Sequence, residues 1–234
     1  MARKGRSAVD KGKKFERLIS KKMSTAFKTN VSRTSMSGSW RGTNNEYNTH
    51  EDNRLLGDLF FPLHHPLNIF NMELKNHDDI KLRTIFINGV QIQDFIEQVV
   101  TDAKRKVGYS VPMLIIHISH EDDYVILPYQ KDMYKSAVKQ GFPIFRSILH
   151  AKDKMHNKTN YYDCIITDLS CFMNQSVSNL AKWYAKVDWD CLNKEQITVD
   201  TEDTDSELDK AITNVANIIT KDGGTDEKDK TIKH

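Results

Sequence analysis

The stretches Leu55-Leu56-Gly57-Asp58-Leu59-Phe60-Phe61 and Met72-Glu73-Leu74-Lys75 decide the expected fold. Each is an apolar run interrupted by charge, and a carboxylate in an apolar strand is costly unless it is paired or binds a cation. Alternate residues of a strand project from the same face, so Glu73 and Lys75 share a face while Leu74 packs behind it. Two carboxylates and a lysine that converge on one point can hold Mg²⁺ against a phosphate.

The composition of the 234-residue chain fits one substantial core with appendages. Hydrophobic residues make up 38% and charged residues 28%, and no stretch approaches the ~18–20 consecutive apolar residues of a membrane helix. No apolar segment follows the first residues, so a secretory signal is not expected and a cytoplasmic location is. Cys164, Cys171 and Cys191 lack CxxC spacing, which predicts reduced thiols rather than disulfides or a zinc site.

The charge of the chain is unevenly distributed. Residues 1–33 carry eleven Lys/Arg and two Asp/Glu, whereas residues 194–234 carry six Lys/Arg and eleven Asp/Glu. A basic segment is the usual footprint of phosphate-backbone binding, although a merely solvated lysine-rich helix would have the same composition. The candidate DNA contacts are basic side chains and one tryptophan that could stack on bases: Arg3, Lys4, Arg6, Lys11, Lys13, Lys14, Arg33, Trp40 and Arg41.

Composition and apolar periodicity divide the chain into four parts. A basic flexible arm over residues 1–10 precedes a core over residues 11–130, and a C-terminal extension over residues 131–193 is expected to pack on that core. Residues 194–234 are polar and acidic with little to bury, so they are expected to form a largely disordered tail. Within the tail, an apolar helical stripe over residues 206–220 predicts either a helix that binds a protein partner or a marginal helix.

Helical and strand patterns alternate through the core and the extension, which predicts a mixed α/β fold. A polar stretch over residues 32–54 is either a functional loop or a mobile one of no special purpose. The expected helices cover residues 11–28, 90–106, 131–140 and 176–187, and the expected strands cover residues 55–61, 67–74, 113–119, 124–128 and 161–169.

A glutamate lies on the apolar face of the first expected helix. At ~100° per residue from Phe15, Glu16 falls at ~100°, between Met23 at ~80° and Phe27 at ~120°. An acidic residue on a buried face is an exception to the usual pattern. Glu16 is therefore either a snorkelling or ion-paired residue near the helix start, or a third acidic group directed at the site of Asp58.

Taken in order, these residues resemble the PD-(D/E)XK nuclease superfamily, most closely the archaeal-type Holliday junction resolvases, a form also carried by phages. Residues 11–17 resemble that family's opening KGxxFER segment, and residues 31–33 resemble the strand before its basic loop. Residues 57–59 match its GxDL-type strand with one residue fewer, residues 72–75 match its second strand, and residues 91–97 are similar to the helix that follows. The loop over residues 32–54 is longer than the family's, and residues after 130 have no counterpart.

The resemblance implies a restriction-endonuclease-like core of helix, mixed sheet, helix and strand, with a C-terminal α/β extension and an acidic flexible tail. It also implies metal-assisted hydrolysis of DNA phosphodiester bonds. Asp58, Glu73 and the Leu74 carbonyl would bind Mg²⁺, for which Mn²⁺ would substitute, and Glu16 would complete the site directly or through water.

The remaining catalytic roles follow from the same resemblance. Lys75 would orient or deprotonate the attacking water, and Gln91 would hold that water or Lys75, with Gln93 the weaker choice. The expected substrate is branched DNA, above all the Holliday junction, in recombination or phage DNA processing in an infected host cell. The two-fold symmetry of that junction suggests a homodimer. A nuclease of flaps, ends or duplexes and a non-catalytic DNA-binding module with the same fold stay open as alternatives.

Overall fold

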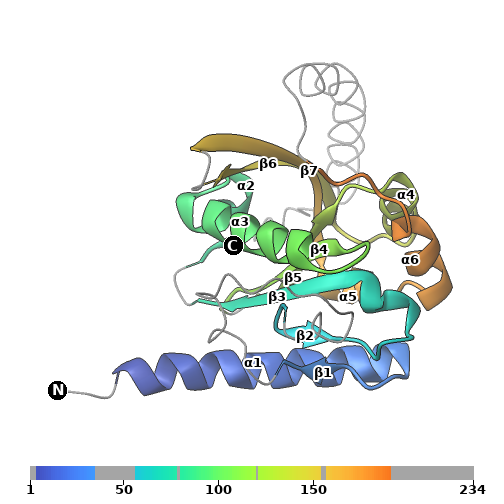
Figure 1. The fold of residues 1–234 in the computed structure, drawn as a ribbon, viewed down its shortest axis with the longest axis horizontal. Coiled ribbons are helices and arrows are strands. Elements are labelled where there is room, and N and C mark those ends of the chain that lie inside the picture. The colour runs from blue at the N-terminus through green and yellow to red at the C-terminus, as the bar shows by residue number, and fades with distance from the viewer. Residues whose placement is uncertain (1–3, 35–55, 78–79, 120, 154–156, 191–234) are drawn as a thin grey trace, which may run out of the picture. The chain divides into compact units, whose positions relative to one another are not determined.

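A seven-stranded mixed sheet with helices on both faces forms the fold (Figure 1). The computed structural model describes residues 4–34, 56–77, 80–119, 121–153 and 157–190. The strand order is β1-β2-β3-β4-β5-β7-β6. The elements are α1 (Lys4–Phe27), β1 (Ser32–Arg33), β2 (Leu59–Phe60), the 3₁₀ turn η2 (Pro66–Ile69), β3 (Phe70–Asn76), α2 (Leu82–Phe86), α3 (Val90–Arg105), β4 (Val111–His117), β5 (Asp123–Pro128), α4 (Lys131–Lys139), β6 (Ile144–Asp153), β7 (Lys158–Asp168), α5 (Leu169–Met173) and α6 (Val177–Tyr184).

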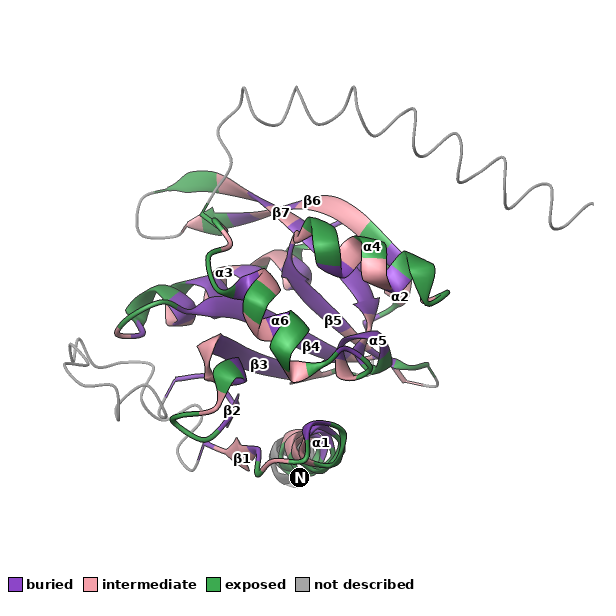
Figure 2. Cartoon of the chain, turned by 90° about the vertical axis from the view of Figure 1, so that its right-hand side faces the viewer, coloured by how far each residue is buried: buried purple, intermediate pink, exposed green. Residues whose placement is uncertain are grey.

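Two hydrophobic clusters sandwich the sheet. Buried residues of α1, α4, α5 and α6 belong to one cluster, and buried residues of α2 and α3 belong to the other. Strand β4 shows the division, because Met113 and Ile115 face the first cluster while Leu114 and Ile116 face the second. Strands β3, β4 and β5 are mostly buried (Figure 2). Helices α1 and α3 therefore lie on opposite sides of β3 (Figure 1).

The crossover connection from β3 to β4 places α3 over the segment Met72-Glu73-Leu74-Lys75 of β3. Strands β3 and β4 are parallel and pair in register from Phe70↔Val111 to Asn76↔His117, and parallel neighbours need a crossover connection. Helices α2 and α3 provide it. Helix α3 begins at Val90 and buries Ile92, Ile96 and Val99, as the apolar period predicts. The predicted mixed α/β fold is confirmed.

Two local predictions differ from the structure. Helix α1 begins at Lys4 rather than near Lys11, so it takes in most of the expected flexible arm; no proline interrupts this segment, and lysine, arginine and alanine favour a helix. The strand expected over residues 55–61 is reduced to Leu59–Phe60. Gly57 has a φ of +78°, which strand backbone does not adopt, so Asp58 precedes the strand instead of lying within it.

Residues 131–190 complete the same sheet with β6 and β7 and also cover one of its faces with α4, α5 and α6. Strand β7 pairs with β5 on one side and with β6 on the other, so the expected boundary at residue 130 divides a single sheet. The first of the chain's two compact units spans Met1–Cys191. Among the described residues, no helix has the length and apolar content needed to cross a membrane. Cys164 and Cys171 are buried free thiols, and the expected tail over residues 194–234, with its 206–220 stripe, lies outside the described residues.

We expect a chain truncated after Gln130 not to fold. It would lose β7, which pairs with β5, and α5, whose Phe172 ring packs 5.8 Å from that of Phe27. Circular dichroism and thermal melts should show no cooperative unfolding of the truncated chain. A chain that ends at Cys191 keeps the whole first compact unit and should melt cooperatively as the control. A cooperative melt of the shorter chain would mean that residues 1–130 are an independent domain.

Candidate active site

Backbone contacts with β3 fix the position of Asp58. Its amide donates a hydrogen bond to the Met72 carbonyl at 2.7 Å, and its Oδ2 accepts one from the Leu74 amide at 2.8 Å. Gly57 permits this close approach, because a Cβ there would lie 2.7 Å from the Met72 carbonyl oxygen and φ is positive. Asp58 is thus held against the strand that carries Glu73 and Lys75.

The Asp58 carboxyl is electrostatically strained. The residue is 7% exposed, and burial, followed by the charge of Glu73, raises its pKa to about 7. The charge of Glu16 raises the pKa further, while the Leu74 amide and Lys75 oppose the rise. Two carboxylates brought together away from water favour a bound cation or a bound proton. The site therefore has the electrostatics of a cation site.

Glu73 and Lys75 project from the face of β3 that α3 covers, where they form a buried polar cluster with Gln98. Lys75 Nζ donates to Glu73 Oε1 at 2.7 Å and to Gln98 Oε1 at 2.9 Å. The Gln98 amide nitrogen donates to the same Glu73 oxygen. The ammonium also lies 5.0 Å from the centre of the Phe95 ring. With side chains 3% and 12% exposed, Glu73 and Lys75 form a fixed pair rather than a solvated surface ion pair.

The Leu74 carbonyl lies on the same side of β3 as Asp58. The amide and carbonyl of one strand residue point to the same neighbour, and the Leu74 amide faces Asp58. Among the described residues, β2 pairs with β3 only at Leu59↔Met72. Strand β2 therefore does not extend along β3 as far as Leu74. Asp58, Glu73 and this carbonyl are oxygen donors of the kind that Mg²⁺ accepts.

The number of protein ligands is small. In the described part of the chain, no group of three or more His, Cys, Asp or Glu side chains is arranged to hold a metal. The fit therefore depends on two carboxylates, Asp58 and Glu73, together with a backbone oxygen. Mg²⁺ tolerates such a set because it usually keeps several of its own waters.

Glu16 and Arg33, to which the sequence assigned separate roles, form an ion pair. Arg33 Nε donates to Glu16 Oε2 at 2.7 Å, and its Nη2 bonds the same oxygen. Glu16 is thus ion-paired, and its charge also raises the pKa of Asp58. Its role as a metal ligand stays a prediction, and so does the contact of Arg33 with DNA.

The structure places Gln98, rather than Gln91, beside the predicted lysine. Gln91 lies one heptad earlier on α3, ~10 Å along the axis, and Gln93 donates to the Asn88 carbonyl at 2.8 Å. Gln91 and Gln98 share one edge of the helix, so the periodicity identified the edge but not the residue opposite Glu73. A catalytic role of Gln91 stays a prediction, and Gln98 is the residue that the sequence interpretation missed.

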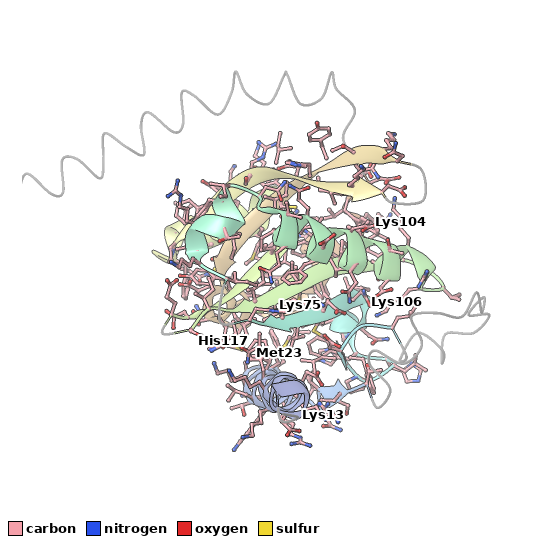
Figure 3. All side chains as sticks on the ribbon, turned by 90° about the vertical axis from the view of Figure 1, so that its left-hand side faces the viewer. Lys13, Met23, Lys75, Lys104, Lys106 and His117 are labelled. Atoms are coloured by element: carbon pink, nitrogen blue, oxygen red, sulfur yellow. The ribbon has the colours of Figure 1, made fainter. Side chains whose placement is uncertain are left out.

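Basic side chains line α1 outside this cluster. Lys11, Lys13 and Lys14 are exposed, and Figure 3 shows Lys13 on the helix below the sheet. Their contact with DNA stays a prediction. The other candidates have side chains outside the described part of the chain: Arg3, Lys4, Arg6, Trp40 and Arg41.

A comparison with known families bears on the cluster of Asp58, Glu73 and Lys75. Residues 7–182 match a family model described as "Phage putative PDDEXK endonuclease". The chain belongs to this family. The predicted membership of the PD-(D/E)XK superfamily is confirmed, but special closeness to Holliday junction resolvases is not shown. No curated protein and no solved structure gave a significant match.

The family match assigns coarse chemistry to this PD-(D/E)XK endonuclease. It is a nuclease, its substrate is DNA, and nucleases of this superfamily generally use divalent metals. The match extends through β6, β7 and α5 into α6, so the family's domain includes the region that had no counterpart in the sequence resemblance.

We expect Asp58→Asn to stabilise the metal-free nuclease at alkaline pH. The folded protein holds the Asp58 proton more tightly than the unfolded chain does, so this contribution is complete below pH ~4 and is lost as pH rises through about 7. Asparagine cannot ionise, and its oxygen can still accept from the Leu74 amide. The free energy of unfolding in EDTA at pH 8 should rise by roughly 1–3 kcal/mol.

Urea unfolding at pH 5 and pH 8 measures this effect, which should shrink at pH 5. The same substitution should remove any rise in Tm that Mg²⁺ gives the wild type. A variant less stable than wild type at pH 8 in EDTA would show that the carboxylate is not strained.

We expect Gln98→Ala to lower the cleavage rate by about 10–100-fold, the usual effect of losing a residue that orients a catalytic group. Lys75 would lose its side-chain hydrogen bond to Gln98, and Glu73 would lose an amide donor. Gln91→Ala is the matched control, with an expected change within about twofold. Single-turnover rates in Mg²⁺ decide between them, and a larger loss at Gln91 would restore the role predicted for it.

Proposed function

We propose that this protein is a Mg²⁺-dependent, structure-selective DNA endonuclease that cleaves Holliday junctions as a homodimer. The observation that carries the catalytic part is the convergence of Asp58, Glu73 and Lys75 at the edge of β3, in a buried site where burial and the charge of Glu73 raise the pKa of Asp58. The family match supports a nuclease. The basic face of α1 supports a polyanionic substrate.

Each residue of the cluster has a distinct role in phosphodiester hydrolysis. Bound Mg²⁺ would supply a water of lowered pKa and would stabilise charge on the phosphate, and Mn²⁺ would substitute because it also accepts oxygen ligands. Asp58, Glu73 and the Leu74 carbonyl would hold the ion, with Glu16 in support. Lys75 Nζ would orient the attacking water and stabilise the negative charge that develops on the phosphate oxygens.

Gln98 would keep Lys75 at its place on β3 during this step. Its oxygen accepts from Lys75 Nζ, and its amide nitrogen donates to Glu73. The cover of α3 keeps bulk water from the pair, which strengthens its electrostatic interactions. The chain thus orders the lysine before substrate binds.

The substrate proposal rests on the sequence resemblance and on symmetry. A four-way junction has two-fold symmetry, so a two-fold dimer can place one site on each of two strands. Flaps and ends have no such symmetry, whereas a linear duplex has two-fold dyads of its own, so the comparison of junction with duplex is left to the binding assay. The dimer and the preference for junctions belong together in this proposal.

We expect Lys75→Ala to lower Mg²⁺-dependent cleavage at least ~10³-fold, as the loss of a group that stabilises transition-state charge does. DNA binding in Ca²⁺ should remain within a few-fold of wild type. Lys104→Ala is the matched control, because Lys104 is an exposed lysine of α3 that pairs with Asp190 instead. Near-normal cleavage by Lys75→Ala would contradict the assigned site.

The same Ca²⁺ assay compares a synthetic four-way junction with linear duplex of equal length. Binding at least about tenfold tighter to the junction at physiological salt supports the resolvase proposal. Equal affinity with active cleavage favours the nuclease of flaps, ends or duplexes. A pure wild-type protein that nicks no DNA in Mg²⁺ would favour the non-catalytic DNA-binding module.

A further inference from the structure

His117 is the last residue of β4, the strand that pairs with β3 next to Lys75. His117 pairs with Asn76, the residue after Lys75, and β3 and β4 are parallel, so both residues lie at the same end of the sheet. From strand spacing and rise, the Cα atoms of Lys75 and His117 are about 6 Å apart. Figure 3 looks onto this end of the molecule and shows Lys75 and His117 above α1.

Two elements hold the His117 ring. Its Nδ1 lies 2.8 Å from Asp123 Oδ1, and the other oxygen of Asp123 accepts from Lys22 Nζ on α1 at 2.6 Å. The Phe15 ring packs 5.4 Å from the imidazole. The Asp123 side chain is 6% exposed, whereas the His117 side chain is 32% exposed. A buried carboxylate therefore fixes one nitrogen of a ring that remains accessible.

The bond to Asp123 determines what the ring can do. Because Nδ1 is engaged, Nε2 is the nitrogen that can meet a ligand. A ring that donates from Nδ1 to Asp123 and from Nε2 to a ligand carries a proton on both nitrogens. Such a ring and Lys22 together place two positive charges beside the one negative charge of Asp123. The ligand that this arrangement fits is an anion.

We propose that His117 Nε2 donates a hydrogen bond to a DNA phosphate within two nucleotides of the scissile phosphate. His117 would thereby position the substrate, with Asp123 positioning His117. The proposal rests on the nuclease function proposed above, which puts the scissile phosphate at Lys75. One DNA strand carries a phosphate every ~3.4 Å of helix axis, so neighbouring phosphates pass within reach of the adjacent strand end.

The side chains of Lys75 and His117 leave opposite faces of the sheet. Lys75 lies on the side of α3, where it contacts Gln98, and His117 lies on the side of α1, where it contacts Phe15. Together they span the strand ends from the catalytic cluster to the basic helix. The same contacts could serve only to fasten the β4–β5 connection to α1, and the two roles differ in whether Nε2 meets the substrate.

Two substitutions of His117 test the roles of its two ring nitrogens separately. His117→Asn keeps an amide N–H near the position of Nδ1, so it can still donate to Asp123, but it has no group at the position of Nε2. His117→Gln extends an amide N–H to the position of Nε2. If Nε2 meets a phosphate, His117→Asn should bind DNA about tenfold more weakly in Ca²⁺, and His117→Gln should recover most of that loss.

Methylphosphonate substitution of single phosphates on both sides of the mapped cleavage position gives the decisive measurement. In wild type, one methylphosphonate within two nucleotides should weaken binding about tenfold, and in His117→Asn the same change should cost nothing more. A purely structural role would not couple to one phosphate. If the loss of affinity from His117→Asn and the loss from the methylphosphonate multiply at every position tested, the proposal is overturned. Thermal melts show whether each variant is folded.

His150→Asn is the matched control. His150 is a half-exposed histidine on β6, at the far edge of the sheet, and its ring contacts Asn88. It should respond to every methylphosphonate as wild type does. Suppose that wild type cleaves DNA, but each methylphosphonate weakens binding by His117→Asn and by Asp123→Asn as much as it weakens binding by wild type. Then only the role of His117 is wrong. If wild type cleaves no DNA in Mg²⁺, the proposed nuclease function fails and the proposal for His117 fails with it.

Discussion

The contact of Asp58 with the edge of β3 is the interaction on which the site depends. Two backbone hydrogen bonds, to the Met72 carbonyl and from the Leu74 amide, hold a carboxylate beside Glu73, where burial and like charge act against it. The two-residue strand β2 is too short to hold the Asp58 carboxylate in place by itself. The positive φ of Gly57 and the hydrophobic clusters on both faces of the sheet help to keep it there. The fold thus stores an unfavourable charge arrangement that a divalent cation, as proposed for this site, would relieve.

The two faces of β3 supply different parts of the site. The α3 face provides Lys75 and its partner Gln98, which lie in a covered environment where a lysine is kept in one orientation. The α1 face provides Glu16, already paired with Arg33 of β1, and the surface on which exposed lysines gather. Neighbouring residues of a strand point to opposite faces, so Leu74 packs in the core on the side opposite Glu73 and Lys75. Its backbone amide meanwhile faces Asp58. The cluster of Lys75 with Gln98 and the exposed lysines predicted to contact DNA are therefore on opposite faces of a single strand.

The sequence predicts those parts of the structure that depend on local alternation or on helical period. Glu73 and Lys75 share a face, and α3 buries Ile92 and Ile96, because both patterns reflect periods of two and 3.6 residues. The identity of Gln98 and the pair of Glu16 with Arg33 depend on how distant segments align, which no period encodes. Strand β6 is unpredicted because its burial does not alternate cleanly, and its assignment depends on the partner β7.

The charges of the site are the reason for proposing that Lys75 does more than neutralise Glu73. Among the described residues, Glu16 pairs with Arg33 and Glu73 pairs with Lys75, whereas Asp58 is held by the Leu74 amide and has no ion-pair partner. A cation bound by Asp58 and Glu73 would take over part of the compensation that Lys75 gives Glu73. The ammonium would then be freer to meet the negative charge of a phosphate, while Gln98 keeps it in place. Metal binding at the proposed site and the readiness of Lys75 for substrate would in this way be coupled through Glu73.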